Sequence, residues 1–207
     1  YQMYWQVYFH PVTRSSEILL RLIFRRAHEL YREGYRFGFL LPPLKQLFEG
    51  VLDVAGYLAL DEAMVQTAFA QWMSEKDGLL ADLCRRFLHR RLYQYSKLED
   101  RDVVWVEELR REWARIGLDP RYHLEMDEPA DSPYDVYRPE DAPEGGGKPP
   151  ILILDGRGGL TEISAKSDII RSIAGTRRGN FYLYYPEDLV RPHADRLPSE
   201  FRRRLGL

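Results

Sequence analysis

The segment TRSSEILLRLIFRRAHELY, residues 13–31, decides how the first part of this chain folds. Its apolar residues recur every three to four positions between Leu19 and Leu30, which is the spacing of one face of an α-helix. Its arginines fall mostly beside that face. The pattern therefore predicts a long helix from Val12 to Gly34 that buries one apolar stripe.

Further helical segments follow, and together they favour a helical region over residues 1–90. A glycine after the last turn and an aspartate before the first turn mark two of these helices. The predicted helices are a short one in LKQLFEG that ends at Gly50, one from the cap Asp61 to about Ser74, and one from Leu79 to about Arg90.

The hydrophobic period changes after residue 90, where short alternating or aromatic runs predict strands between helices. The order predicts an α+β fold: the helical amino-terminal part, then a small ferredoxin-like mixed or antiparallel sheet in residues 91–207 with helices on one face. The predicted elements are a strand at 92–95, a helix from Val103 to Ile116, short extended runs at 122–126 and 134–137, a hairpin over 151–164, a helix capped by Ser164 or Ser167 and ended by Gly175, and a strand at 181–185.

One segment of the second part is expected to be a mobile loop. Residues 138–150 contain four prolines and three glycines in thirteen positions.

The composition excludes several classes of protein. The 207 residues are 44% apolar and 30% charged with a formal net charge of −2, which is typical of a globular protein. No apolar run approaches the roughly 18 residues that cross a bilayer. Bulk nucleic-acid binding needs a net basic surface, which this balance does not supply. The single cysteine, Cys84, excludes an intramolecular disulfide and fits a reducing, cytoplasmic location.

The first residues, YQMYWQVYFHP, resemble the last turns of a helix that is already under way. Tyr1, Tyr4, Trp5 and Tyr8 have helical spacing, and Pro11 is expected to end the run. The segment has neither a basic region nor a cleavage site typical of a signal peptide. We therefore expect the chain to be part of a longer protein.

No catalytic residue and no metal site is predicted within the chain. Its five histidines are scattered without ligand spacing, there is no His-Asp dipeptide, and no serine lies in a nucleophile elbow. GRGG at 156–159 favours a hairpin turn over a phosphate loop, because a predicted strand follows it where a phosphate loop requires a helix.

Two groups of residues have both a structural and a functional interpretation. The aromatic cluster of Tyr4, Trp5 and Tyr8 with His10 suits core packing, and it also suits stacking on a nucleobase or sugar. The arginine pairs suit surface ion pairs, although arginine is also the residue that binds phosphate in a bidentate manner. Among the arginines Arg90 is the candidate, since it ends a predicted helix next to a strand.

Four segments in order resemble one known family: MYWQVYFHP at 3–11, the helix at 13–31, FLHRRLYQY at 87–95 and, more faintly, FYLYYP at 181–186. They are similar to bacterial HD-domain phosphohydrolases of the dNTP triphosphohydrolase (dGTPase-like) type, which are related to the vertebrate SAM-and-HD-domain enzyme. The resemblance implies that this chain is the carboxy-terminal half of such an enzyme. Residues 1–90 would continue the HD catalytic domain, and residues 91–207 would form an associated α+β domain.

The resemblance also implies a reaction and its partners. In that family a His, a His-Asp pair and a further Asp hold a divalent metal, and water attacks the α-phosphate of a deoxynucleoside triphosphate to release triphosphate. Those ligands would lie outside this chain, which alone would be inactive. The implied partners are the amino-terminal HD half, a deoxynucleotide and further copies in a homo-oligomer.

By position in the matched segments, Tyr8 resembles the tyrosine that packs against the deoxyribose, with Tyr4 as a further substrate-binding residue. His10 resembles a histidine of a regulatory nucleotide site at a subunit interface, and Arg90 a phosphate-binding arginine of that site.

Two residues depart from the family pattern. Regulated relatives have basic residues where this chain has Pro11 and Gln94, so the positive charge available to a triphosphate is smaller. Separately, a non-catalytic nucleotide-sensing or oligomerisation module is the alternative function, from a different class.

Overall fold

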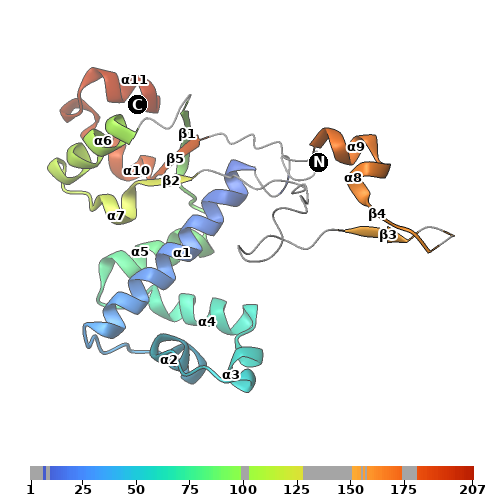
Figure 1. Ribbon diagram of the computed structural model, residues 1–207. Helices are drawn as coiled ribbons and strands as arrows, with labels where there is room; N and C mark the ends of the chain where they lie inside the picture. The colour runs from blue at the N-terminus through green and yellow to red at the C-terminus, as the bar shows by residue number, and fades with distance from the viewer. Residues whose placement is uncertain are drawn as a thin grey trace.

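The computed structural model describes residues 7, 10–98, 103–127, 151–154, 156, 158–173 and 181–207 (Figure 1). Two predicted site residues, Tyr4 and Tyr8, lie outside the described residues, and so do the predicted loop at 138–150 and the predicted run at 134–137. Within the described ranges a bundle of helices is followed by a sheet with helices and by a separate hairpin.

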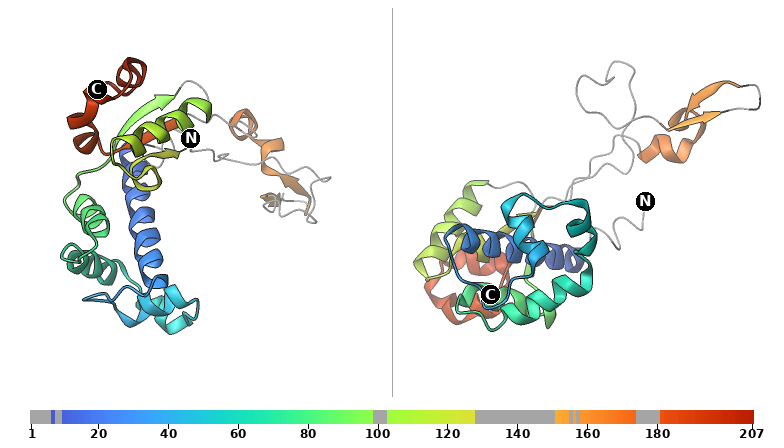
Figure 2. Two further views of the ribbon diagram at one scale, coloured as in Figure 1. Left: turned by 90° about the vertical axis from the view of Figure 1, so that its left-hand side faces the viewer. Right: turned by 90° about the horizontal axis from the view of Figure 1, so that it is seen from below.

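Helix α1 (Pro11–Arg32) is the long helix that the first segment predicts, and it is confirmed. Proline is accommodated at its first position because the amide hydrogen that proline lacks would have no partner there. Its buried stripe includes Leu19, Leu22 and Ile23, each fully inaccessible to solvent. At 22 residues the helix is about 33 Å long, so it reaches both the helical part and the sheet (Figure 2).

Four more helices complete the helical part, and each of the last three begins at an aspartate whose side chain accepts a backbone N–H. The predicted helices near Gly50, after Asp61 and after Leu79 are confirmed, whereas α3 was not predicted. The helices are α2 (Pro42–Glu49), α3 (Val54–Ala59), α4 (Glu62–Trp72) and α5 (Gly78–Leu88).

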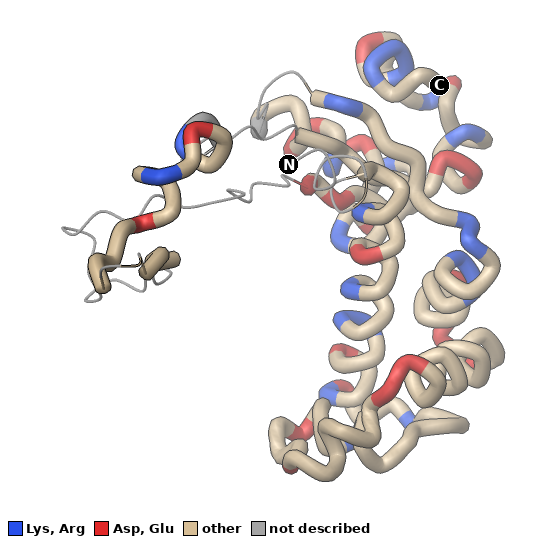
Figure 3. Tube along the Cα trace, turned by 90° about the vertical axis from the view of Figure 1, so that its right-hand side faces the viewer, with Lys and Arg blue, Asp and Glu red and all other residues tan. Residues whose placement is uncertain are grey.

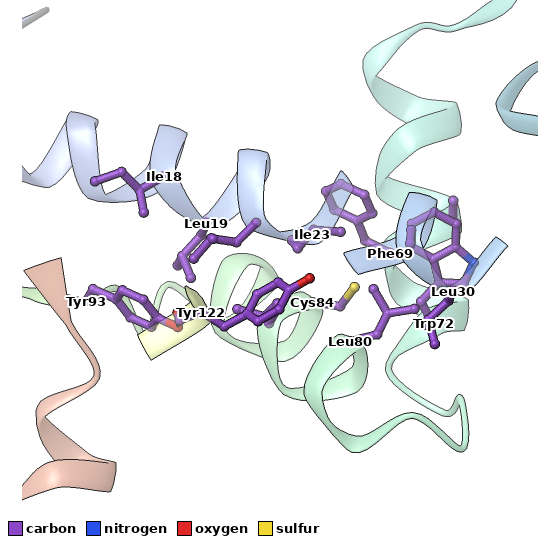
Figure 4. Packing of buried hydrophobic residues seen from close by; sticks show 14 of the residues in the cluster. Ile18, Leu19, Ile23, Leu30, Phe69, Trp72, Leu80, Cys84, Tyr93 and Tyr122 are labelled. Atoms are coloured by element: carbon purple, nitrogen blue, oxygen red, sulfur yellow. The ribbon is translucent and has the colours of Figure 1, made fainter. Parts of the chain in front are cut away.

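The core of this part lies between α1, α4 and α5 (Figure 4). Phe69 and Trp72 of α4 are fully buried against the apolar stripe of α1. The indole N–H of Trp72 donates to the carbonyl of Phe39 at 2.7 Å, so the ring is buried without leaving its polar atom unpaired.

A three-stranded antiparallel sheet follows, with β5 (Phe181–Tyr185) between β1 (Gln94–Leu98) and β2 (Glu125–Asp127). One face of this sheet packs on α6 (Val103–Arg115), α10 (Glu187–Val190) and α11 (Ser199–Leu205). The α+β class and the antiparallel sheet are confirmed. Strand β1 begins two residues later than predicted.

The opposite face of the sheet meets the beginning of α1. Tyr184 packs into the core formed by α1, α4 and α5, whereas its neighbours Leu183 and Tyr185 pack into the core formed with α6, α10 and α11. Successive side chains of a strand point to opposite faces of the sheet, which explains this alternation. The hydroxyl of Ser15 donates to the carbonyl of Tyr93 at 2.9 Å and is buried there. The sheet therefore lies between two cores.

Ion pairs connect α1 to β2. Figure 3 shows the positions of the basic residues along α1. Arg14 donates two hydrogen bonds to Asp127, at 2.8 and 2.7 Å, and this carboxylate is almost fully buried. Arg21 and Arg25 both contact Glu125. The arginines beside the apolar stripe thus dock the sheet onto the helix.

The predicted hairpin is confirmed but forms a sheet of its own, β3 (Leu152–Leu154) with β4 (Leu160–Glu162), and does not extend the central sheet. Both edges of β5 are already used by β1 and β2. Gly158 has φ +82°, which confirms a turn at the glycine-rich segment. Ser167 divides the following helix into α8 (Ile163–Lys166) and α9 (Asp168–Ile173), and this unit stands apart in both views of Figure 2.

The remaining elements were not predicted, because each is too short for a clear period. They are α7 (Pro120–His123), a 3₁₀ helix (Arg191–Arg196), and the helices α10 and α11 named above. None of the helices that the structure describes is long and apolar enough to cross a membrane.

Replacing Leu22 by alanine is expected to lower the free energy of unfolding by about 2–5 kcal/mol, because the fully buried side chain leaves a cavity in the core of α1. The matched control is Leu58→Ala. Because Leu58 is 74% exposed, this substitution is expected to change the free energy of unfolding by no more than about 0.5 kcal/mol. Urea denaturation measures both values, and equal losses would contradict the described core.

Candidate functional site

A cavity of about 400 Å³ lies where the first turn of α1, the end of α5, β1 and the start of α10 meet. Its volume is within the range of ordinary ligand pockets. Its walls come from segments far apart in the sequence and include three arginines, two acidic residues and two tyrosines. The lining residues are Val12, Arg86, Arg90, Arg91, Leu92, Tyr93, Gln94, Tyr95, Glu187 and Asp188.

Arg90 joins α5 to β1 in an unusual backbone conformation. Its φ is +54°, and among the described residues it is the non-glycine residue with a positive φ. Such positions are uncommon for residues with a side chain and cluster at functional sites. The side chain of Arg90 is exposed, and none of the ion pairs between described residues involves it. Its guanidinium is therefore available to a ligand.

The other two arginines of the cavity are both paired with Asp188, and Arg86 is also paired with Asp82. Arg86 is almost fully buried and donates to both oxygens of Asp188, at 2.8 and 2.9 Å, while its Nε contacts Asp82 at 2.6 Å. Arg91 contacts Asp188 at 3.0 Å. Because α5 and α10 each contribute a charge, this network joins the helical part to the sheet part.

The same network controls the ionisation of Asp188. Burial alone would raise the pKa of its carboxyl group, but the hydrogen bonds and charge of Arg86, together with the charge of Arg91, hold that pKa below its usual value. Asp188 therefore stays negative at neutral pH and keeps the two arginines engaged. The acidic residue beside it, Glu187, pairs with Arg191.

Of the two predicted regulatory residues, Arg90 lines this cavity and His10 does not. His10 precedes the lining residue Val12 by two positions. His10 is the N-cap of α1, where its Nδ1 accepts the backbone N–H of Val12 at 3.3 Å, and its side chain is exposed. The positive end of the α1 dipole therefore lies beside the cavity.

Both departures from the family pattern have a place in the structure. Gln94 lines the cavity as a neutral residue, and Pro11 occupies the first position of α1.

Sequence reasoning missed Arg86, Asp188 and Tyr95 as wall residues. The spacing of Asp82 and Arg86, four apart on a helix, was a signal for the ion pair, whereas nothing in the sequence indicated that Asp188 would join it.

The divalent metal that the resemblance implies has no ligand set in the part of the chain that the structure describes. No three side chains of His, Cys, Asp or Glu come together there in a way that could hold an ion. We therefore assign no step of a metal-dependent reaction to these residues.

Comparison with known proteins gives one curated relative and a structural neighbour. The chain is 44% identical over 191 residues to the uncharacterized protein YwfO of Bacillus subtilis strain 168, which covers 92% of this chain and 43% of YwfO. A crystal structure of a phosphohydrolase from Bacteroides thetaiotaomicron superposes with a TM-score of 0.61 at 22% identity, covering 88% of this chain and 47% of that one. The chain shares its fold with part of that phosphohydrolase. No family model matches.

Both similar proteins are longer than this chain. The chain spans less than half the length of both YwfO and the phosphohydrolase.

Replacing Arg86 by methionine is expected to lower the free energy of unfolding by about 2–4 kcal/mol, because Asp188 and Asp82 lose their hydrogen-bonded partner. Arg91→Met is the matched control: that side chain is 56% exposed, so its loss is expected to cost less than about 1 kcal/mol. Denaturant unfolding of both variants tests whether Arg86 holds the two parts together.

The effect of Arg86→Met is also expected to depend on pH. The pKa of Asp188 is lowered in the folded protein, so its ionised form stabilises the fold at pH values above the ordinary aspartate pKa of 3.8. This stabilisation is lost as the pH falls below that value. The difference in free energy of unfolding between wild type and variant should therefore shrink in acid. A difference that stays constant would assign the effect of the substitution to packing alone.

Proposed function

We propose that this chain is the carboxy-terminal part of an HD-type phosphohydrolase that hydrolyses deoxynucleoside triphosphates to deoxynucleosides and triphosphate. The four matched sequence segments support the family, and the fold shared with part of a phosphohydrolase supports the hydrolase class. The observation that carries the proposal for this chain is the cavity lined by Arg90, beside the beginning of α1.

In this proposal the chain binds a regulatory nucleotide at that cavity. Arg90 donates to the phosphate oxygens, because a guanidinium offers several N–H groups in the geometry that phosphate accepts. His10 and the positive end of α1 add to the attraction. Tyr95, which lines the same cavity and is 42% exposed, offers a ring on which a base can stack.

The ion pair of Arg86 with Asp188 holds together the part of the cavity wall that these two residues form. Because both of these charges are already engaged, Arg90 is the cation that meets the phosphate. One free guanidinium attracts an anion more weakly than a cluster would, as expected from the neutral residues Pro11 and Gln94 at positions that are basic in regulated relatives.

The chemical step belongs, in this proposal, to the amino-terminal HD half of the longer protein, which supplies the divalent metal and the attacking water. Tyr8 and Tyr4 would complete the substrate site against the sugar. The protein would act in the cytoplasm as a homo-oligomer, with the regulatory cavity near a subunit interface.

A non-catalytic nucleotide-sensing or oligomerisation module is the second candidate. It is supported by the observation that every residue lining the cavity belongs to this chain, so that a ligand could bind there without the rest of a longer protein. In that case binding would occur without any hydrolysis by the longer protein.

Replacing Arg90 by asparagine is expected to weaken binding of a deoxynucleoside triphosphate by about tenfold or more, because the charged hydrogen bonds to phosphate are lost. Asparagine tolerates the positive φ of this position, so the backbone is retained. Arg111→Asn on α6 is the control, since that arginine is exposed and remote from the cavity. Titration calorimetry with each of the four deoxynucleotides measures the affinities; equal affinities for the two variants would refute this site.

Hydrolysis separates the two candidate functions. The 207-residue chain with deoxynucleoside triphosphates and Mn²⁺ is expected to release no triphosphate, whereas the longer protein containing it is expected to do so, because the proposed metal ligands lie outside this chain. Ion chromatography of the products checks both. Release by the chain alone would show that the chemistry has been misplaced, and no release by the longer protein would favour the sensing module.

A further inference from the structure

A second cavity, of about 380 Å³, lies further along α1 and takes no part in the proposed function. It is a groove between α1, the start of α4 and α5. Most of its wall is apolar, and these side chains are only partly covered by their neighbours. They are Leu20, Phe24, Leu60, Val65 and Phe87.

The apolar surface continues beyond the groove onto α3. Val54, Tyr57 and Leu58 are 76%, 69% and 74% exposed, and α3 has no buried residue. Leu58 precedes the groove residue Leu60 by two positions. We call the groove together with these three side chains the α3 surface. Adjoining apolar side chains on a surface mark an interaction site more often than isolated ones.

The edge of the α3 surface is acidic. Asp53 and Asp61 accept backbone N–H groups at the starts of α3 and α4, and Glu62 accepts from the side-chain amide of Gln66. Within the described ranges none of the three forms an ion pair with a cation. Two of them, Asp61 and Glu62, line the groove, so their negative charges lie at the edge of this surface.

We propose that the α3 surface binds a helix of a partner protein that has one apolar face and basic residues beside it. A groove between helices accepts the apolar side chains of such a helix, spaced three and four apart. Lysines or arginines at its flanks meet Asp61 and Glu62, so that charge complementarity favours this partner over an acidic one.

Two other occupants fit the surface less well. A small cationic ligand fills the groove but leaves Tyr57 and Leu58 in water. A second copy of this chain docked through the same surface brings one acidic edge against another, and like charges at an interface are unfavourable.

The test uses a synthetic helical peptide of about 15 residues with leucines at i, i+3, i+4 and i+7 and lysines at its flanks. A matched peptide has glutamates in place of the lysines. Fluorescence anisotropy with the 207-residue chain is expected to show binding of the lysine peptide and affinity for the glutamate peptide lower by at least about tenfold.

Two variants locate the contact. Leu58→Glu is expected to abolish binding of the lysine peptide, whereas Leu154→Glu, at a 67% exposed leucine of the hairpin, is expected to leave it unchanged. Glu62→Lys is expected to weaken binding of the lysine peptide and to strengthen binding of the glutamate peptide. Glu108→Lys on α6 is the control. Circular dichroism and thermal melting establish that each variant is folded.

Three results would overturn the proposal. One is equal affinity for the two peptides, which would remove the role of the acidic edge. Another is retained binding by Leu58→Glu, which would place the contact in the groove alone. The third is self-association of the chain that Leu58→Glu abolishes, measured by sedimentation, which would assign the surface to a second copy.

Discussion

The position of α1 between two cores is the constraint on which the rest of the structure depends. Its apolar stripe packs against α4 and α5, while its first turns hold the sheet through the bond from Ser15 to Tyr93 and the ion pair of Arg14 with Asp127. A buried carboxylate such as Asp127 is costly unless its charge is compensated. Sheet and helix are therefore held in one relative position, and the cavity at their junction has a fixed shape.

Within that junction, charge is distributed unevenly. Arg86 and Arg91 are held by Asp188, whereas Arg90, between them in sequence, has its side chain directed to solvent. The positive φ of Arg90 causes this separation, since it turns the chain out of the helix just before β1. Neighbouring arginines thus have different roles: two maintain the wall, and one is available to an anion.

Much of the helical part could be predicted from the sequence, because a long apolar period such as that of α1 allows one interpretation only. The sheet was predicted less completely. FYLYY was recognised as a strand, but its central place between β1 and β2 depends on contacts distant in sequence. The α3 helix was missed because its apolar residues face water and have no period set by a core. Arg90 was predicted as a site residue from its place beside a strand and from the resemblance. Asp188, the partner of Arg86, was not predicted because it lies in α10, a helix too short to show a period.

The central place of β5 has a consequence for the order of folding. Gln94 pairs with Tyr185, so the sheet cannot close until residue 185 has left the ribosome. The helical part depends on contacts closer in sequence and has no such requirement, and domains that rely on local contacts form quickly. During synthesis β1 and β2 must therefore wait with exposed edges, and a nascent chain that stops before residue 181 would leave those edges open to aggregation.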